Sequence, residues 1–441
     1  MFLWYKGREF FRIFGSRKQI FNYLFKKQLS MKIILNFSKC IMILSLLSLT
    51  CTVLSCDEMD IDQGPPISST RNLMISFKID TITYSQIPAE HARRILSLDE
   101  STSVVTDKSK RSFRVNELFQ IRKASDQLLS ITSYSAKTVY NLTLEAYVEG
   151  GSQYIPIAYL DSIPGFSQFE FKPSLINGNF IYKNGDGIDT LSLSSLNEKQ
   201  MKFRLLSDDK HFKMLSKIDA QWGVSFSNYD WKPGYENGSW RELRAIYARE
   251  WVVIITNYAY MMTTPEYSFI MRNFSKVFGG ELYDNNRVKF TPEKYLSEEK
   301  RFKQPHNFVC GRSKPSVGGL GGGNVWGVTH WNYYGHYASF SGWESITHEF
   351  MHCMGYGHSS NMTYASGGVG WTEFMWQLHT YLRGNDWLPY TDRNLLGFHK
   401  PENAKYRDGG IDPDKLNDNK ILQFYNKSKV TQYFLANPLS K

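Results

Sequence analysis

Short runs in which apolar and polar residues alternate follow one another from residue 73 to residue 235. A strand places successive side chains on opposite faces, so this alternation predicts strands that each bury one face. Clear examples are residues 137–150, 153–163 and 200–206, and Gly, Pro and Asn residues separate the runs. Many short strands with turn residues between them predict an antiparallel, β-sandwich-like domain over residues 73–235.

The pattern changes after this domain. Residues 241–262 form a long apolar run, which predicts a buried helix. Ser239 and Glu242 match the S-x-x-E form of a capping box, so we expect this helix to begin next to them.

Two further helix starts follow. Thr264 and Thr291 are each followed by proline, a combination typical of an N-cap and the first helical position. The chain is therefore expected to be an α+β protein, with a second domain over residues 236–400 and a C-terminal extension over residues 401–441.

The formal net charge of +10 is concentrated at the N-terminus. Residues 1–30 contain seven basic residues and one acidic residue, and Lys32 and Lys39 bring the first 55 residues to +8. The remainder is nearly neutral, which excludes nucleic acid as an expected partner. With 42% hydrophobic and 15% aromatic residues, the composition is that of a folded protein.

Residues 31–55 predict a lipoprotein signal peptide, because two lysines lie before a short apolar stretch. The uncharged run 40–55 is shorter than the roughly 20 residues of a membrane-spanning helix, and a retained transmembrane anchor is the alternative. Val-Leu-Ser before Cys56 resembles a lipobox, so Cys56 is expected to be lipidated. We interpret residues 1–30 as a mis-assigned start, with an amphipathic membrane-binding arm as the alternative, and residues 56–72 as a flexible tether.

Lipidation of Cys56 would anchor the protein to a membrane of the cell envelope, and we expect the outer membrane. The acidic residues at 57–62 resemble a signal for export to the cell surface. Of the remaining cysteines, Cys310 and Cys353 lie outside the predicted signal. They could form one disulfide or remain two buried thiols, and the sequence leaves both open.

Eight of the ten histidines lie after residue 300, and three of them form an HExxHxxGxxH pattern at residues 348–358. His348 and His352 are four residues apart, so on a helix they project from one face and can bind the same metal ion. Glu349 follows the first of them and can reach a water held on that metal.

Gly355 can end this helix at positive φ with little steric cost, which lets His358 arrive as a third ligand. Three protein ligands and an open fourth position are typical of a catalytic Zn²⁺ site. All five fixed positions are those of the metzincin zinc metallopeptidases, which residues 236–400 resemble. The resemblance implies a metzincin-like catalytic domain there, with zinc metallopeptidase activity.

In metzincins a methionine on a tight turn lies beneath the metal-binding histidines. Residues 360–364, SNMTY, match the usual S-x-M-x-Y form. The resemblance therefore implies that Met362 is the Met-turn residue and that Tyr364 is an extra zinc ligand or a transition-state donor. Met362 follows His358 by only four residues, and Met375, within a predicted helix, is the alternative.

A glycine-rich segment at residues 318–323 precedes VWGVTHW at residues 325–331. No GK[ST] follows the glycines, so a phosphate-binding loop is not indicated. The resemblance implies an edge strand that pairs with extended substrate, and residues 325–331 are the candidate. His330 and His336 either line the site or pack elsewhere, and the Gly, Trp and Tyr content suggests a glycoprotein substrate.

These features predict a zinc-dependent endopeptidase that hydrolyses extracellular protein or glycoprotein substrates. In it, zinc would activate a water, Glu349 would act as general base, and Tyr364 would stabilise the oxyanion. One alternative is a gluzincin-type metallopeptidase in which Glu373 replaces His358 as the third ligand. The other is a non-catalytic surface lipoprotein that binds peptide or glycan through residues 73–235.

Overall fold

The structure is a computed structural model. It describes the greater part of the chain after residue 90, together with three two-residue strands before it, β1 (Ile75–Ser76), β2 (Lys78–Ile79) and β3 (Ile82–Thr83). The continuous ranges are 90–125, 128–148, 154–171, 179–184, 187–192, 201–235, 237–337, 339–409 and 423–439. Four predictions concern residues outside these ranges: the mis-assigned start (1–30), the signal peptide (31–55), the lipidation of Cys56 and the tether (56–72). In the described part, every helix is too short or too polar to cross a bilayer.

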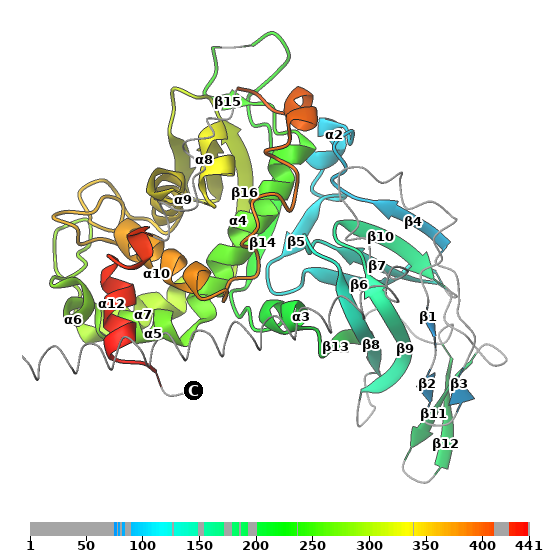
Figure 1. Cartoon of the computed structure of the whole chain (residues 1–441). Coiled ribbons are helices and arrows are strands. Elements are labelled where there is room, and N and C mark those ends of the chain that lie inside the picture. The colour runs from blue at the N-terminus through cyan, green and yellow to red at the C-terminus, as the bar shows by residue number, and fades with distance from the viewer. Residues whose placement is uncertain are drawn as a thin grey trace, which may run out of the picture. The chain divides into compact units, whose positions relative to one another are not determined.

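Two four-stranded antiparallel sheets form the first part of the protein (Figure 1). In the first sheet the order is β1, β9 (Ile155–Ile163), β8 (Val139–Val148) and β13 (Met201–Ser207). In the second it is β4 (Glu90–Arg94), β10 (Ser167–Phe171), β7 (Leu129–Ser133) and β6 (Phe119–Lys123). A separate hairpin pairs β11 (Asn179–Asn184) with β12 (Gly187–Ser192).

Alternation along the strands builds the core that these two sheets share. In β7 and β10 every second residue is buried, including Ile131 and Phe169. These side chains pack in one cluster with Leu144 and Leu160 from the first sheet. The antiparallel β structure expected for this region is therefore present, and the mixed content of helices and antiparallel sheets is that of an α+β protein.

A third, mixed sheet runs across the expected boundary at 235/236. Its order is β17 (Gly319–Gly322), β18 (Val325–Thr329), β16 (His306–Ser313), β14 (Trp222–Phe226) and β5 (Ser112–Arg114), and β15 (Trp240–Arg241) also pairs with β16. β14, β16 and β18 are parallel, and the other pairs are antiparallel. Strands from residues 112–114 and 222–226 thus belong to the same sheet as strands beyond residue 300. Alternation predicted the strand at residues 222–226 but carries no information about its partners.

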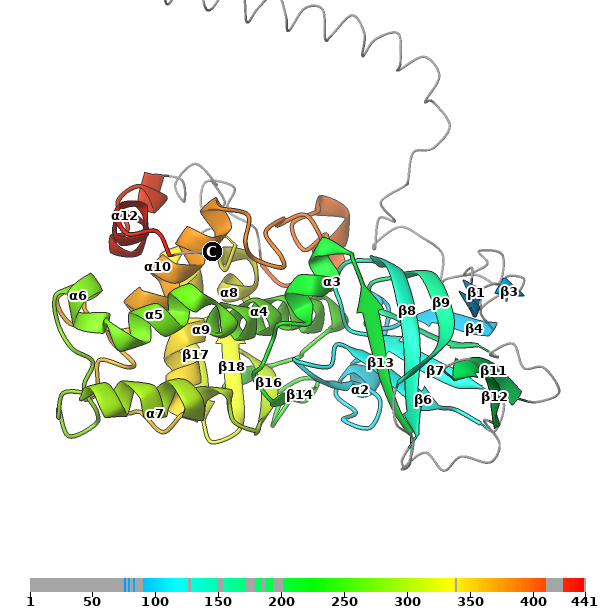
Figure 2. The ribbon, with the colours of Figure 1, turned by 90° about the horizontal axis from the view of Figure 1, so that it is seen from below.

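Two helices, α4 (Ala245–Thr263) and α9 (Phe340–Cys353), cover one face of this mixed sheet, as Figures 1 and 2 show. The indole N–H of Trp251 in α4 donates to the carbonyl of Gly311 in β16 over 3.2 Å. The indole N–H of Trp326 in β18 donates to the carbonyl of Ile346 in α9 over 3.1 Å. Buried tryptophans with satisfied N–H groups therefore fix both helices against the strands.

The predicted capping box at Ser239 and Glu242 is wrong. The helix begins at Ala245, and Trp240 lies in β15, which pairs with β16. The ring of Trp240 stacks on Tyr229 with centroids 4.0 Å apart. Strand pairing and this aromatic packing outweigh the local preference of the S-x-x-E pattern for a helix start.

The predicted starts at Thr264 and Thr291 are confirmed. Each threonine hydroxyl accepts a backbone N–H from the first turn, and proline occupies the start of the helix. These helices are α5 (Pro265–Arg272) and α7 (Pro292–Lys303). Further helices of the described chain include α2 (Thr102–Val105), α3 (Lys210–Leu215), α6 (Phe274–Phe278), α8 (His330–Gly335), α10 (Trp371–Gly384), the 3-10 helix η2 (Pro401–Tyr406) and α12 (Lys429–Ala436).

The C-terminal residues expected as an extension contribute to the main core. Val430 and Phe434 of α12 are buried in the cluster that also holds Phe374 of α10 and Trp251 of α4. The expected extension over residues 401–441 therefore includes a helix that packs on the helical part of the protein.

Candidate metal centre

Helix α9 places His348 and His352 on one face. The hydroxyl of Ser339 caps its N-terminus by accepting the N–H of Gly342. The helix ends at Cys353, and Gly355 follows at a φ of 85°, in the left-handed region. The glycine turns the chain as expected, because this conformation is costly for a residue with a Cβ.

The turn brings the third histidine of the pattern to the first two. The Nε2 atom of His352 lies 3.0 Å from Nε2 of His348 and 3.0 Å from Nε2 of His358. One ligand atom from each of the three lies within 4.8 Å of the others. His348 is buried, His352 is partly buried and His358 is exposed, so the cluster opens to solvent on the side of His358.

Carbonyl groups fix the tautomers of two of these rings. Nδ1 of His348 lies 2.9 Å from the carbonyl oxygen of Thr363, and Nδ1 of His352 lies 2.7 Å from that of Tyr356. A carbonyl oxygen only accepts, so both Nδ1 atoms carry the proton and both Nε2 atoms present lone pairs. Burial is the largest cause that lowers the pKa of His348, to about 4, and it also lowers the pKa of His352, so both rings are neutral at pH 7.

Two neutral Nε2 lone pairs that face one another at 3.0 Å repel, because no proton lies between them. A cation at the centre of the three atoms removes this repulsion. The second hydrogen bond from each Nδ1–H to a carbonyl is the arrangement that orients metal-binding histidines. The three residues therefore fit a metal ion with nitrogen ligands.

Glu349 follows His348 in α9 and is only 6% exposed. Burial raises the pKa of its carboxyl to about 8. A cation held by the neighbouring histidines would lower this pKa again, because it favours the charged carboxylate. The backbone of β17 lies directly against it: a Cβ atom on Gly319 would come within 2.4 Å of its Oε1, and one on Gly321 within 2.7 Å of its Oε2. Glycine at these two positions leaves the space that the carboxylate occupies.

Sequence reasoning missed this role of the glycine-rich segment. Residues two apart in a strand lie on one face, so glycine at 319 and 321 was a usable indication that something approaches that face closely. The identity of the approaching group depends on the packing of α9 against β17, which no local pattern contains.

The SNMTY turn lies next to the first histidine. Thr363 supplies the carbonyl that accepts the Nδ1–H of His348, and Met362 is fully buried. The ring of Tyr364 has its centroid 4.4 Å from that of His348 and 5.2 Å from that of His358, and its side chain is 51% exposed. The structure therefore brings Met362 and Tyr364 to the histidine cluster.

Asn285 was not anticipated and braces the loop that carries His358. Its Oδ1 accepts the N–H of Gly357 over 2.7 Å, and its Nδ2 donates to the carbonyl of Gly355 over 3.0 Å. Its own carbonyl accepts the hydroxyl of Ser359. A lone asparagine 73 residues upstream of His358 offered no sequence pattern by which to find it.

Glu373, the alternative third ligand, lies in α10 and its Oε1 accepts the side-chain N–H of Gln377 over 2.7 Å. Among the described residues, the cluster able to hold a metal contains His358 and not Glu373. Met375, the alternative Met-turn residue, is a fully buried core residue of the same helix.

The remaining candidates lie away from the cluster. His336 is fully buried, with its Nε2 3.1 Å from Oε2 of Glu250, and His330 begins helix α8. Cys310 and Cys353 are both free, buried thiols, which answers the question that the sequence left open. The Cys353 thiol donates to a backbone carbonyl of β18.

The expected edge strand over residues 325–331 is wrong. β18 (Val325–Thr329) is paired on both sides, with β16 and with β17, so neither of its edges is free. The edge of the sheet next to α9 is instead β17, the glycine-rich segment. The apolar content of residues 325–331 reflects burial between two strands rather than an open edge.

No family model, no curated protein and no solved structure matches this chain. What the site can bind follows from its donor set. Three imidazole nitrogens converge at a position that is open on the side of His358, and the ring of Tyr364 lies against two of the three rings. The buried carboxylate of Glu349 belongs to the residue that follows His348 in α9.

Proposed function

We propose that the protein is a zinc-dependent endopeptidase with a metzincin-like catalytic centre. The observation that carries the proposal is the convergence of three Nε2 atoms, with the rings of His348 and His352 oriented through their Nδ1–H groups. Imidazole ligands suit zinc and other transition-metal ions rather than Mg²⁺ or Ca²⁺, and three protein ligands are typical of catalytic rather than structural zinc. His348, His352 and His358 would hold the metal.

When bound, zinc supplies Lewis acidity, which polarises a peptide carbonyl and makes water acidic enough to attack near neutral pH. Glu349 accepts a proton from the attacking water and delivers it to the nitrogen of the leaving amine as the peptide C–N bond breaks. Its position one residue after His348 supports this role. The glycines of β17 exclude side chains from the space around its carboxylate.

We assign Tyr364 as the donor to the oxyanion. Its ring contacts His348 and His358, and half of its surface is exposed. A phenolic O–H donated to the developing oxyanion would stabilise the transition state. The assignment of this donor rests on proximity to the histidines.

The edge strand β17 supports extended polypeptide as the substrate. Its sequence, GLGG, presents backbone groups with few side chains in the way, and its outer edge is unpaired in the described sheet. A substrate in β conformation can add to such an edge through main-chain hydrogen bonds. Lipidation of Cys56 would place this activity in the cell envelope, on extracellular protein or glycoprotein.

Substitution of Glu349 tests the proposal. Glu349→Gln should retain zinc at near-stoichiometric level and lose about 10²- to 10⁴-fold in activity, the usual contribution of a general base. Glu344→Gln, one turn earlier on α9, is the matched control and should remain active. The assays are metal content by mass spectrometry and cleavage of an unfolded protein and a mucin-type glycoprotein, with a chelator control.

The two parts of the proposal fail separately. An active Glu349→Gln variant would overturn the assignment of the base. Absence of zinc binding by the wild-type protein would overturn the proposal that it is a zinc-dependent enzyme.

A further inference from the structure

The second antiparallel sheet has a polar face that the metal centre does not use. Its other face is buried in the shared core. On the polar face, four side chains cross the sheet in register, one from each strand: Arg93, Gln168, Thr132 and Gln120. Two residues further along, a second row contains Glu170, Ser130 and Arg122. Polar side chains on every strand, in register, form a continuous floor.

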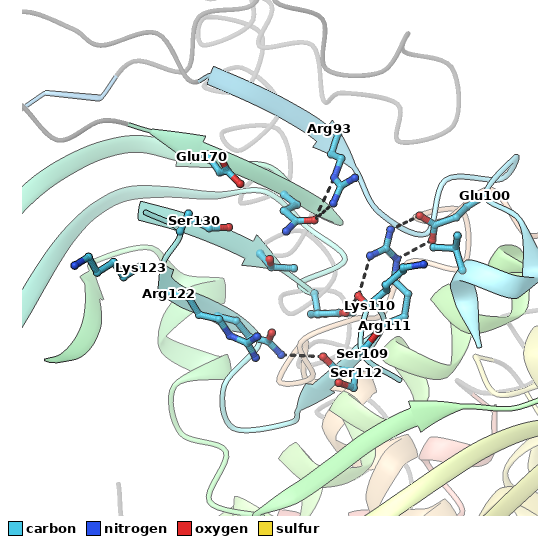
Figure 3. Close-up of a pocket in the computed structure, with 16 residues that line it drawn as sticks. Arg93, Glu100, Ser109, Lys110, Arg111, Ser112, Arg122, Lys123, Ser130 and Glu170 are labelled. Carbon is cyan, nitrogen blue, oxygen red and sulfur yellow. Dashed lines mark hydrogen bonds and ion pairs between the residues drawn. The ribbon is translucent and has the colours of Figure 1, made fainter. Parts of the chain in front are cut away.

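A wall stands over this floor and encloses a cavity of about 690 Å³ (Figure 3). The wall includes Glu100 and residues 109–112, and a buried ion pair between Arg111 and Glu100 fixes it. Nε of Arg111 donates to Glu100 over 2.8 Å, and the same carboxylate accepts the N–H of Leu96. The cavity is therefore formed before any ligand arrives, which lowers the entropic cost of binding.

The charge of the cavity is positive. The Arg111–Glu100 pair is neutral as a unit, and Lys110 is paired with Asp107. Among the described lining residues, this leaves Arg93, which donates to the neutral Gln168, and Arg122 against the carboxylate of Glu170. Figure 3 shows Arg93 and Arg122 on opposite sides of the floor. β4 and β6 are the two edge strands of this sheet and are separated by three strand spacings, about 14 Å, so the two guanidinium groups come from opposite edges of the sheet. A concave surface of one sign concentrates ligands of the other sign.

The floor chemistry favours a carbohydrate over a peptide. Peptides that bind sheets add to a free edge, whereas this surface is the face of a sheet whose inner strands are already paired. Among the described residues of the lining, the aliphatic side chains are Val104 and Ala124, so this surface does not resemble an apolar groove for a helix. Hydroxyl and amide side chains between two arginines can instead bond to sugar hydroxyls, while the guanidinium groups bind carboxylate or sulfate.

We propose that this cavity binds an acidic oligosaccharide, a glycan that carries carboxylate or sulfate groups and spans several sugar units. The guanidinium groups of Arg93 and Arg122 bind acidic groups of the glycan at the two edges of the sheet. Thr132 and Gln120 bond to hydroxyl groups between them. Binding requires neither zinc nor the proposed peptidase activity.

Calorimetric titration of the full chain with defined oligosaccharides tests the proposal. The probes are a uronic acid oligosaccharide, a sulfated oligosaccharide, a neutral oligosaccharide of equal length, and poly-glutamate. We expect at least one acidic oligosaccharide to bind, with an affinity that falls as salt rises, and the neutral one not to bind. Arg93→Ala and Arg122→Ala should each weaken binding about tenfold, because each removes charge-assisted hydrogen bonds.

Matched variants separate the cavity from non-specific attraction. Lys217→Ala removes an exposed cation outside the cavity and should leave the affinity unchanged. Thr132→Val keeps the shape of the floor but removes a hydroxyl, so it should weaken oligosaccharide binding and not the response to poly-glutamate. Both arginines are exposed, so their variants are expected to fold, and thermal unfolding verifies this.

Three results would overturn the proposal. They are unchanged affinity in both arginine variants, equal affinity for poly-glutamate and the acidic oligosaccharides, and no binding of either acidic oligosaccharide. Glu349→Gln should bind the oligosaccharide with the affinity of the wild type. The proposal for oligosaccharide binding can therefore fail independently of the proposal for endopeptidase activity.

Discussion

The contact between β17 and Glu349 gives a sharp prediction for Gly319→Ala. The added Cβ would lie 2.4 Å from Oε1 and 2.5 Å from Cγ of Glu349. Ordinary contacts of a Cβ atom begin at 3.4 Å, so the carboxylate must move by about 1 Å. The side chain is flexible, and a rotamer adjustment costs about 0.5–1.5 kcal/mol, so the protein should still fold.

The loss of activity should be much larger than the loss of stability. Displacement of a reacting group by about 1 Å can reduce the rate on the order of 10²-fold. Gly318→Ala is the matched control, because its Cβ would meet nothing closer than 4.0 Å. Gly321→Ala differs again: its Cβ would lie 2.4 Å from the backbone carbonyl oxygen of Glu349, so α9 itself must shift and stability should fall.

The measurements are kcat/KM on an unfolded protein substrate, zinc content and thermal unfolding for the three glycine variants. Gly319→Ala should retain zinc and a midpoint close to that of the wild type while losing about 10²-fold in kcat/KM. If Gly319→Ala is as active as Gly318→Ala, the close approach of β17 to the carboxylate does not matter for catalysis. Positioning of the Glu349 carboxylate by β17 would then be refuted as a requirement for its role as general base.

Three further predictions concern metal binding and stability. His358→Ala should lose zinc at equilibrium whereas Glu373→Ala should retain it; the opposite result in metal analysis would restore the carboxylate as third ligand. Burial lowers the pKa of His211 and of His399 to about 4, below the unfolded value of 6.5, so the unfolded chain takes up protons that the folded chain does not as pH falls from 6.5 to 4. Urea unfolding should show that the free energy of unfolding falls by at most about 3 kcal/mol per histidine over that window. His211→Gln should reduce this pH dependence, and an unchanged pH dependence would contradict the burial of the ring. Asp408→Asn should lower the free energy of unfolding by about 2 kcal/mol, because it leaves the buried guanidinium of Arg312 without its carboxylate. The loss is smaller than for a fully buried pair, since Asp408 is partly exposed. An unchanged unfolding midpoint would contradict this prediction.

The convergence of the three histidines was predictable because its determinants are local. His348 and His352 are set by helical periodicity, and Gly355 marks the turn that delivers His358. The structure brings all three histidines together as the spacing predicted. Helix starts at Thr264 and Thr291 were predictable for the same reason, since a cap and its proline are neighbours in sequence.

Partners that are distant in sequence were not predictable. Alternation identified residues 222–226 as a strand, but only the fold shows that they pair with residues 306–310 in the mixed sheet. Ser239 and Glu242 satisfied a local rule for a helix start, yet the backbone at Trp240 pairs with β16 instead. Local preference decides an element only where no stronger distant contact competes for the same residues.

The glycine-rich segment shows how the two kinds of information combine. Residues 318–323 lacked the pattern of a phosphate loop, and the expected edge strand was assigned to the apolar residues that follow. The structure exchanges these roles, since the apolar strand is buried between two neighbours and the glycine strand forms the edge beside α9. The physical reason is that Glu349 needs room: side chains at 319 and 321 would occupy the volume of its carboxylate. The glycines that make β17 a weak strand by propensity thus allow it to lie next to α9. The same lack of side chains would keep its outer edge accessible to the extended substrate that we propose.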